Sequence, residues 1–267
     1  MKIGVVCTGS ILRFARKLED MARIHTQHKS DEITCITTRE SADLAGRTGY
    51  FNQVWAVDIP SKWQILSCFL LKNRFRDFRF DRVYNLSNEG FFKHRQTHTP
   101  PKDLDVTNHW ADYDLGFYQL PARFFVINMD QFNPDRPALP LARLTALCRA
   151  LAAPKIRPVL VGSHRYQDEA RKVENLCPEA LNLCGQLDLF EMAALSRQAD
   201  FWIGYECAAS YLAAFCDCKT LCLYDDSQDV QEQECPHGQS VIVFQADMKS
   251  TRATEITRIL NEQGWLI

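Results

Sequence analysis

The sequence lacks an excess of positive charge. Its 31 Lys and Arg residues are balanced by 33 Asp and Glu residues, which gives a formal net charge of −2 at pH 7. Proteins that bind nucleic acid over a broad surface carry a strong cationic field. The charge balance therefore excludes that class of binding, and we expect no nucleic-acid partner.

Long apolar runs are also missing. No stretch approaches the roughly 18 consecutive apolar residues of a membrane-spanning helix. The first residues, MKIGVVCTGSILRFARKLEDMAR, have no basic segment before their apolar run and no small-residue cleavage site, so they do not resemble a secretory signal. We expect a cytoplasmic protein.

The 11 cysteines show neither a disulfide framework nor a zinc motif. Their number is odd, and many lie inside apolar runs such as VVCTG and TLCLYD, as reduced core cysteines do. One group of metal-ligand types is close in sequence: Cys216, Cys218, Cys222, Cys235 and His237. Its C-x-C-x3-C spacing differs from the paired C-x2-C patterns of zinc sites, so we expect no metal.

Two pairs of histidines have helical spacing. They are His25 with His28 and His94 with His98. Neither pair has a strongly supported third metal ligand nearby, so we expect both pairs to lie on the surface.

The apolar content is sufficient for a sizeable core, at 46% of the residues. Short apolar runs alternate with helical patterns in the first half of the chain. We predict strands at 2–7, 32–37, 53–57 and 82–86, and helices at 12–24, 40–44 and 63–75. This alternation is typical of a parallel sheet covered by helices.

Residues 94–121 contain two adjacent prolines and no sustained period, so we interpret them as a connecting region. The alternation then resumes, with strands at 124–128, 158–162, 180–184, 201–204, 220–224 and 240–244 and helices at 141–152, 168–176, 189–198, 206–215 and 254–261. Asp188 and Glu191 predict a capping box. We predict an α/β protein with two Rossmann-like domains, residues 1–120 with a linker from about 94 and residues 121–267, whose parallel sheets face a central cleft.

The segment 182–224 carries a recognisable pattern: a glycine after a strand, a helix, an alanine-aspartate pair before an apolar strand, and then a further helix. The residues on this pattern are Gly185, Ala194, Leu195, Ala199, Asp200, Gly204, Leu212, Ala213 and Ala214. The segment resembles glycosyltransferase family 9, the ADP-heptose:lipopolysaccharide heptosyltransferases, in which the last helix starts with the form D-[ST]-G-x-x-H-L-A-A. Weaker likeness extends to 74–86, 125–128 and 158–170.

The resemblance implies the GT-B fold and transfer of a heptose-like sugar by direct displacement. The C-terminal domain would hold a nucleotide-diphosphate sugar, expected to be an ADP-sugar, and the N-terminal domain would present a hydroxyl of lipopolysaccharide or another glycan or glycolipid. No cofactor or metal is implied. A lipid-linked acceptor also implies peripheral contact with the inner membrane face. The segment 62–72 and the arginines that follow it suit such a surface, or else form a core-packed helix with a solvated basic face.

Two departures from the family pattern affect the chemistry. The first strand-to-helix turn reads Thr8-Gly9-Ser10 where the family has a Gly-Asp pair that supplies the presumed general base. The catalytic candidates are therefore Ser10, at the usual position, and Glu89, in the turn after the strand at 82–86. The chain is also shorter than usual for the family, chiefly in the acceptor half.

The second departure lies in the donor half, where D-[ST]-G-x-x-H is replaced by Glu206, Cys207, Ala208, Ala209, Ser210 and Tyr211. The free N–H groups of this helix start would face a diphosphate, with Glu206 on the sugar or positioning the loop and Cys207 as the flanking small polar group. The other donor-site candidates are Asn128, Arg136 in place of the family's lysine, Arg165 for diphosphate charge, and Gln167 or Asp168 for the ribose. The alternatives are an ordinary strand-helix turn, a solvated capping loop and a surface arginine.

Three functions remain open on these residues. The first is a glycosyltransferase. The second is a catalytically inactive GT-B-like binding or assembly protein that has lost the base and the histidine. The third is another GT-B enzyme, such as a nucleotide-sugar epimerase, whose acid and base residues the sequence does not reveal.

Overall fold

A computed structural model describes residues 1–61, 63–87, 92, 97–101, 104, 113–131, 133–152, 156–228, 235–236 and 240–266. The chain divides into two compact units, Met1–Trp110 and Ala111–Ile267. The boundary predicted at residue 120 stays a prediction, because residues 105–112, next to this division, lie outside the described part of the chain.

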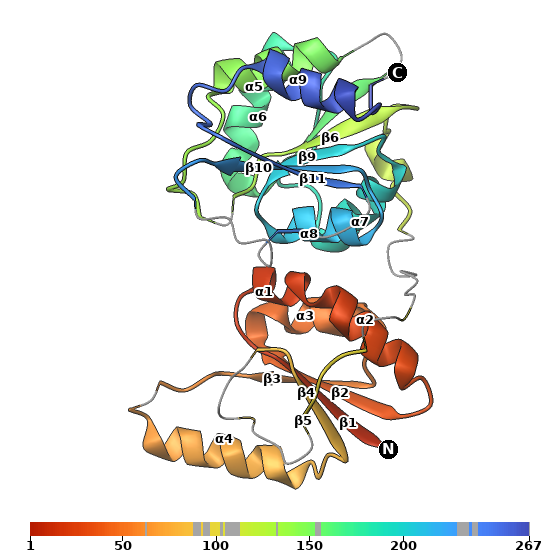
Figure 1. The fold of residues 1–267 in the computed structure, drawn as a ribbon, viewed down its shortest axis with the longest axis vertical. Coiled ribbons are helices and arrows are strands. Elements are labelled where there is room, and N and C mark those ends of the chain that lie inside the picture. The colour runs from red at the N-terminus through yellow and green to blue at the C-terminus, as the bar shows by residue number, and fades with distance from the viewer. Residues whose placement is uncertain are drawn as a thin grey trace. The chain divides into compact units, whose positions relative to one another are not determined.

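Unit 1 is built on a parallel sheet with the strand order β3-β2-β1-β4-β5 (Figure 1). Its strands are β1 (Lys2–Cys7), β2 (Glu32–Thr38), β3 (Gln53–Val57), β4 (Arg82–Asn85) and β5 (Thr97–His98). β1 is central, and Val5 lies between Cys35 of β2 and Tyr84 of β4. β5 lies inside the region predicted to be a connection. It has only two residues, too few for any period to reveal it.

Three helices cover one face of this sheet and α4 covers the other (Figure 1). They are α1 (Ile11–Arg16), α2 (Leu18–Gln27) and α3 (Arg39–Arg47), with α4 at Ile65–Asp77. The single helix predicted at 12–24 is wrong, because the backbone leaves the helical range at Lys17 (φ −106°, ψ 6°). The buried residues from Leu12 to Ile24 would spread over more than half the circumference of one continuous helix, at about 3.6 residues per turn. The break lets each half turn its own apolar side inward.

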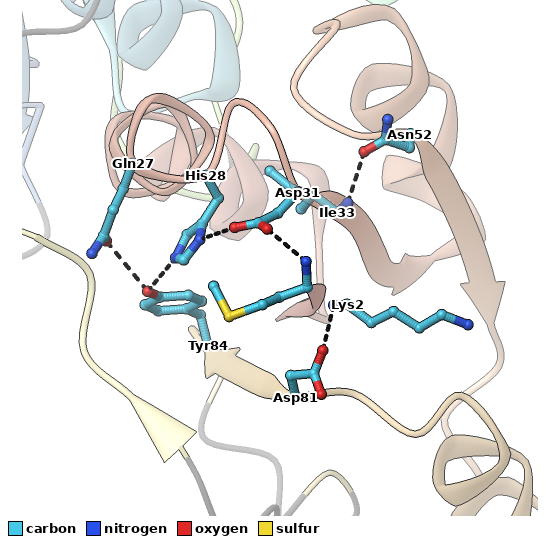
Figure 2. Close-up of polar contacts among 9 residues, drawn as sticks. Lys2, Gln27, His28, Asp31, Ile33, Asn52, Asp81 and Tyr84 are labelled. Atoms are coloured by element: carbon cyan, nitrogen blue, oxygen red, sulfur yellow. Dashed lines mark hydrogen bonds and ion pairs between the residues drawn. The ribbon is translucent and has the colours of Figure 1, made fainter.

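A polar network joins the amino ends of the strands in unit 1 (Figure 2). His28 is 3% exposed, so the predicted surface position is wrong. Its Nδ1 lies 2.8 Å from Asp31 Oδ2 and its Nε2 lies 2.9 Å from the Tyr84 hydroxyl. Tyr84 is 56 residues away, so spacing along one helix gave no sign of this partner. The Lys2 N–H donates to Asp81 at 2.7 Å in the same region.

Unit 2 has a parallel sheet with the order β11-β10-β9-β6-β7-β8. The strands are β6 (Phe124–Asn128), β7 (Arg157–Val161), β8 (Leu181–Asn182), β9 (Trp202–Tyr205), β10 (Thr220–Asp225) and β11 (Val241–Ala246). The helices are α5 (Leu141–Leu151), α6 (Gln167–Leu176), α7 (Leu189–Gln198), α8 (Ala208–Phe215) and α9 (Ala253–Glu262), with short 3-10 turns η2 (Gly116–Tyr118) and η3 (His164–Tyr166).

Both faces of this sheet are buried, which explains the unbroken apolar run of β6. Phe125 and Ile127 pack with α5, α6 and α9, while Phe124 and Val126 pack with α7 and α8. Successive side chains of a strand point to opposite faces, so β6 contributes to two cores. Asp188 caps α7 by accepting from the N–H groups of Phe190 (2.8 Å) and Glu191 (2.9 Å), and the Glu191 carboxylate accepts from the Asp188 N–H (2.8 Å). The predicted capping box is confirmed.

The strand orders place a topological switch point in each unit. In unit 2 the chain runs from β6 outward to β8, then returns to β9 on the other side of β6 and continues to β11. In unit 1 the corresponding neighbours are β1 and β4. Open α/β sheets bind ligands outside the carboxyl ends of the strands at such a point. The predicted α/β class with two parallel, Rossmann-like sheets is confirmed.

All 11 cysteines lie within the described residues, and all are free thiols. Ten are buried and Cys68 is half-buried, so the prediction of reduced core cysteines is confirmed with that exception. In the described part of the chain, no group of three or more His, Cys, Asp or Glu residues could hold a metal ion, and His237 is not described. No helix within the described ranges is long and apolar enough to cross a membrane.

Candidate functional site

The switch point of unit 2 brings the ends of β6 and β9 into close contact. Asn128 is paired with Gly204 in the strand register. A side chain at Gly204 would place its Cβ 2.9 Å from both Ser210 Oγ and Trp202 Nε1, and 3.1 Å from Asn128 Cβ. Only glycine therefore allows the first turn of α8 to sit directly against these two strands.

A buried hydrogen-bond network joins the ends of β6 and β9 to the start of α8. Asn128 Nδ2 donates to Cys207 Sγ at 2.9 Å, and Cys207 Sγ lies 3.5 Å from Ser210 Oγ. The Ser210 hydroxyl donates to the Tyr205 carbonyl at 2.7 Å. Burial raises the pKa of Cys207 to about 11, so the thiol keeps its proton at neutral pH and can donate to Ser210. These side chains hold the strand ends and the start of α8 in place.

Glu206, the residue before Cys207, forms an ion pair with Arg136. One guanidinium nitrogen of Arg136 donates to Glu206 Oε2 at 2.7 Å, although the residues are 70 positions apart. Glu206 is 7% exposed, while the Arg136 side chain is 37% exposed. The pair borders an open pocket that is also lined by Gln131, Asn133, Tyr205 and Gln228. A carboxylate and an accessible guanidinium thus meet at the switch point.

The segment after β6 is held in position by the strand ends beside it. The Tyr205 hydroxyl accepts from the Leu139 N–H at 2.9 Å. Asp130 accepts from the Ser163 N–H at 3.0 Å and from the Ser163 hydroxyl at 2.8 Å. Asp130 was missed in the sequence, although it follows one predicted strand as Ser163 follows the next. The carboxyl ends of neighbouring parallel strands meet, and that rule could have paired them.

The residues predicted to bind the ribose, Gln167 or Asp168, and Arg165, predicted to offset the diphosphate charge, lie on η3 and α6, after β7. Arg165 and Asp168 are exposed, and Gln167 is half-buried. The Asp168 side chain is 87% exposed and lies 3.6 Å from Arg171 on the same helix. Next to them, a Cβ on Gly185 would lie 2.5 Å from His164 Nδ1, and Gly185 has φ +75°. The turn after β8 therefore requires glycine so that η3 can pack against it. The ribose role of Gln167 or Asp168 and the diphosphate role of Arg165 stay predictions.

In unit 1, Ser10 is the N-cap of α1. Its hydroxyl accepts from the Arg13 N–H at 3.4 Å. The preceding residue, Gly9, has φ +121°, and its carbonyl accepts from the Thr38 hydroxyl at 2.6 Å. Glu89, the other catalytic candidate, lies outside the described residues. Both catalytic assignments stay predictions.

A carboxylate that the sequence did not point to reaches this same turn. Glu40, in the first turn of α3, accepts from the Ile11 N–H at 3.2 Å. β1 and β2 are parallel neighbours, so the helices that follow them start side by side. The turn that contains Ser10 thus has a carboxylate from the next strand-helix unit beside it.

Comparisons with known proteins agree with the fold described above. Residues 138–263 match the family model for glycosyltransferase family 9 (heptosyltransferase). No curated protein sequence matches the chain. Among solved structures, E. coli heptosyltransferase WaaC with ADP is similar with a TM-score of 0.72 and 13% identity, covering 99% of this chain and 98% of that one.

Two further structures show how widely the fold is shared. E. coli ADP-heptose lps heptosyltransferase II has a TM-score of 0.70 and 13% identity, over 98% of each chain. S. aureus MnaA with UDP has a TM-score of 0.54 and 13% identity, over 99% of this chain and 89% of that one. Likeness at this identity establishes the fold. The chain thus has the GT-B fold of the heptosyltransferases, and its residues 138–263 match the model of glycosyltransferase family 9.

Proposed function

We propose that the protein transfers a heptose-like sugar from an ADP-sugar to a hydroxyl of lipopolysaccharide or a related glycan. The observation that carries the donor side is the Arg136–Glu206 pair at the rim of the pocket where β6 and β9 end. The choice of ADP follows from the similar WaaC, whose structure contains ADP, and from the family model. A lipid-linked acceptor would also require the protein to reach a membrane surface.

The diphosphate would lie between Arg136 and the start of α8. The guanidinium offers several N–H donors, and the first N–H groups of a helix have no partner within the helix. Ala208 and Ala209 occupy this first turn. Both sources of positive charge would stabilise the diphosphate as it leaves. Glu206 would accept a hydrogen bond from a sugar hydroxyl, and its contact with Arg136 keeps the carboxylate from repelling the diphosphate.

The acceptor side needs a group that removes a proton from the attacking hydroxyl. As the acceptor oxygen bonds to the anomeric carbon, the bond from that carbon to the diphosphate breaks and a base takes the hydroxyl proton. Glu40 supplies a carboxylate at the turn where Ser10 replaces the family's aspartate. The Ser10 hydroxyl already accepts from a helix N–H, so it suits a capping role better than that of a base.

The alternative function is a binding or assembly protein without transfer activity. It is favoured by Thr8-Gly9-Ser10 at the usual position of the base and by Tyr211, 6% exposed, at the usual position of the histidine. Such a protein would keep the donor pocket and lack turnover.

Thermal unfolding with ADP, UDP, GDP and CMP tests the donor site. A ligand at 100 times its dissociation constant adds about 2.7 kcal/mol, which raises the melting temperature by several degrees. We expect the largest shift with ADP and a larger one with ADP-heptose. Arg136→Gln should weaken ADP about 10- to 100-fold, since it removes a charged hydrogen-bond donor worth about 1.5–3 kcal/mol.

The matched control is Arg258→Gln, an exposed arginine on α9 that pairs with Glu262 at 3.8 Å. This variant should bind ADP as the native protein does. If no nucleotide shifts the melting temperature at millimolar concentration, the transferase proposal fails. If ADP binds but no ADP is released from ADP-heptose with any lipopolysaccharide acceptor, the binding-protein alternative holds. If transfer occurs, Glu40→Gln should abolish it and leave ADP affinity unchanged.

A further inference from the structure

Gln228, in the turn after β10, lines the pocket bordered by Arg136 and Glu206, here called the donor pocket. Its backbone N–H donates to the Asp225 carbonyl at 3.0 Å, and its side-chain Oε1 accepts from the Asp225 N–H at 2.8 Å. The Gln228 carbonyl accepts from Gln245 Nε2 at 2.7 Å. Because a backbone N–H can only donate, the side-chain atom that faces it must be the oxygen. The protein therefore sets the orientation of this amide, and Nε2 faces away from Asp225.

The turn that carries Gln228 is anchored at Asp225, which is 3% exposed. The Asp225 carboxylate accepts from the N–H groups of Ser227 and Met248, both at 3.1 Å, and from the Ser227 hydroxyl. Hydrogen bonding, chiefly from the Ser227 hydroxyl, holds the pKa of Asp225 below its usual value, so the carboxylate stays charged at neutral pH. Met248 follows β11, so this carboxylate ties the ends of β10 and β11 together. The position of Gln228 is thus ordered by contacts within the protein.

Two hydrogen-bond donors in the donor pocket are left for a ligand. No residue that the structure describes accepts from Gln228 Nε2 or from the Tyr205 hydroxyl. The Tyr205 oxygen accepts from the Leu139 N–H, and burial raises the pKa of Tyr205, so the hydroxyl keeps a proton that it can donate. A ligand that fits this pocket must therefore offer acceptor atoms to both groups.

The lining of the donor pocket suits an uncharged sugar. Among the described lining residues, the charged ones are Arg136 and Glu206, which neutralise each other in their ion pair. The rest of the lining combines amide and phenol groups with apolar contact, from Gln131, Asn133, Gln228, Tyr205, Pro137 and Leu223. Sugar hydroxyls both donate and accept hydrogen bonds, and the ring has apolar C–H faces. A diphosphate carries negative charge and is better stabilised at the start of α8.

We propose that Gln228 selects the sugar of the donor, through hydrogen bonds that its Nε2 donates to sugar hydroxyl oxygens. Tyr205 donates to the same sugar, and Glu206 accepts from one of its hydroxyls. Gln228 is then a specificity-determining residue, and Asp225 is a positioning residue that acts through it. A ligand without hydroxyls at this place leaves these polar groups unpaired and binds less tightly. The proposal rests on the donor site proposed above and adds which residue distinguishes the sugar from the nucleotide.

Calorimetric titration of the full chain with ADP and with ADP-heptose tests the proposal. The quantity to compare is the sugar gain, defined as the Kd for ADP divided by the Kd for ADP-heptose. Gln228→Met keeps the length of the side chain and removes its polar atoms. We expect this variant to keep the native affinity for ADP and to lower the sugar gain about three- to tenfold, the effect of losing one hydrogen bond. A merely structural role would weaken both ligands alike and leave the sugar gain unchanged.

The matched control is Gln64→Met in unit 1. Gln64 Oε1 accepts from the Ser61 N–H at 3.0 Å, three residues earlier, as Gln228 Oε1 does from Asp225. This variant should keep the native sugar gain. The proposal is overturned if the native chain binds ADP-heptose no more tightly than ADP, or if Gln228→Met keeps the native sugar gain. In both cases ADP binding would still support the donor site, whereas failure of both ligands to bind would overturn the donor site and this proposal together.

Discussion

The two units share a strand order around the switch point but differ in the side chains that meet at the carboxyl ends of the central strands. In unit 1, Asp31, Asp81 and His28 gather at the amino ends of the strands. At the carboxyl ends of β1 and β4, the Thr8 hydroxyl donates to Ser87 Oγ at 3.0 Å. In unit 2, Arg136 and Glu206 meet at the carboxyl ends. Topology therefore locates a site, and the side chains at that site decide whether it suits an anionic ligand.

The ion pair of unit 2 also differs from the unit 1 network in its accessibility. Glu206 is buried, so its negative charge has a desolvation cost, and Arg136 is reached by solvent. Pairs of this kind contribute little net stability. The His28 network instead closes a buried contact between α2 and β4. We interpret the unit 2 pair as a binding device and the unit 1 network as a structural one.

The largest effect on this comparison is expected from Gly204→Ala. The new Cβ would lie 2.9 Å from Ser210 Oγ and Trp202 Nε1, so α8 or β9 must move. We expect a loss of about 1–3 kcal/mol in the free energy of unfolding, typical of overpacking, together with weaker ADP binding. Urea unfolding measures the first and the ADP melting shift the second.

Gly46→Ala in α3 is the matched control. A Cβ at this position meets no atom within 4 Å, and alanine favours a helix over glycine by about 1 kcal/mol. This variant should be as stable as the native chain or more so. Equal losses from both glycine variants would refute the view that close packing at the unit 2 switch point needs glycine.

A smaller effect is expected from Ser10→Ala. Removing the N-cap of α1 should cost about 1 kcal/mol of stability. ADP affinity should not change, because Ser10 belongs to the unit without the donor pocket. Ser10→Asn, which retains a capping side chain, should restore stability. A catalytic Ser10 would show a different result, namely transfer activity lost in both variants.

The smallest effect concerns how the stability contributed by Asp31, in the polar network at the amino ends of the unit 1 strands, depends on pH. Hydrogen bonds from the terminal amine and from His28 hold the pKa of Asp31 below its usual value. The stabilisation is therefore complete above the unfolded pKa of about 3.9 and is lost as the pH falls through the folded value. Asp31→Asn should lower the melting temperature at pH 6, and the difference from the native chain should shrink as the pH falls below 4. A difference that stays constant over that range would contradict this assignment.

Much of the fold followed from local patterns. β1, β3, β6 and α7 begin and end at the predicted residues, because each is a run of one period bounded by turn or capping residues. The break at Lys17 was not predictable in this way, since no glycine or proline marks it. It arises from the different directions in which Leu12 and Met21 must face to reach one sheet.

Some residues of the candidate site were likewise identified from the sequence, and others only from the structure. Arg136 and Glu206 were identified separately, the first as a cation after β6 and the second as a carboxylate at a helix start. Their contact across 70 residues came only with the structure. Glu40 and Asp130 were missed because each acts on a neighbouring strand-helix turn, and only the order of the strands shows which turns are neighbours.

The sequence by itself determined the parallel α/β class, the succession of strands and helices, the reduced cysteines and the family pattern at 182–224. These depend on periodicity and local chemistry, which act over a few residues. The tertiary structure alone decided that His28 is buried, that Arg136 reaches Glu206 and that Glu40 lies at the turn of Ser10. Each of these depends on which distant segments become neighbours when the sheets form, and that information is not contained in any short window of the chain.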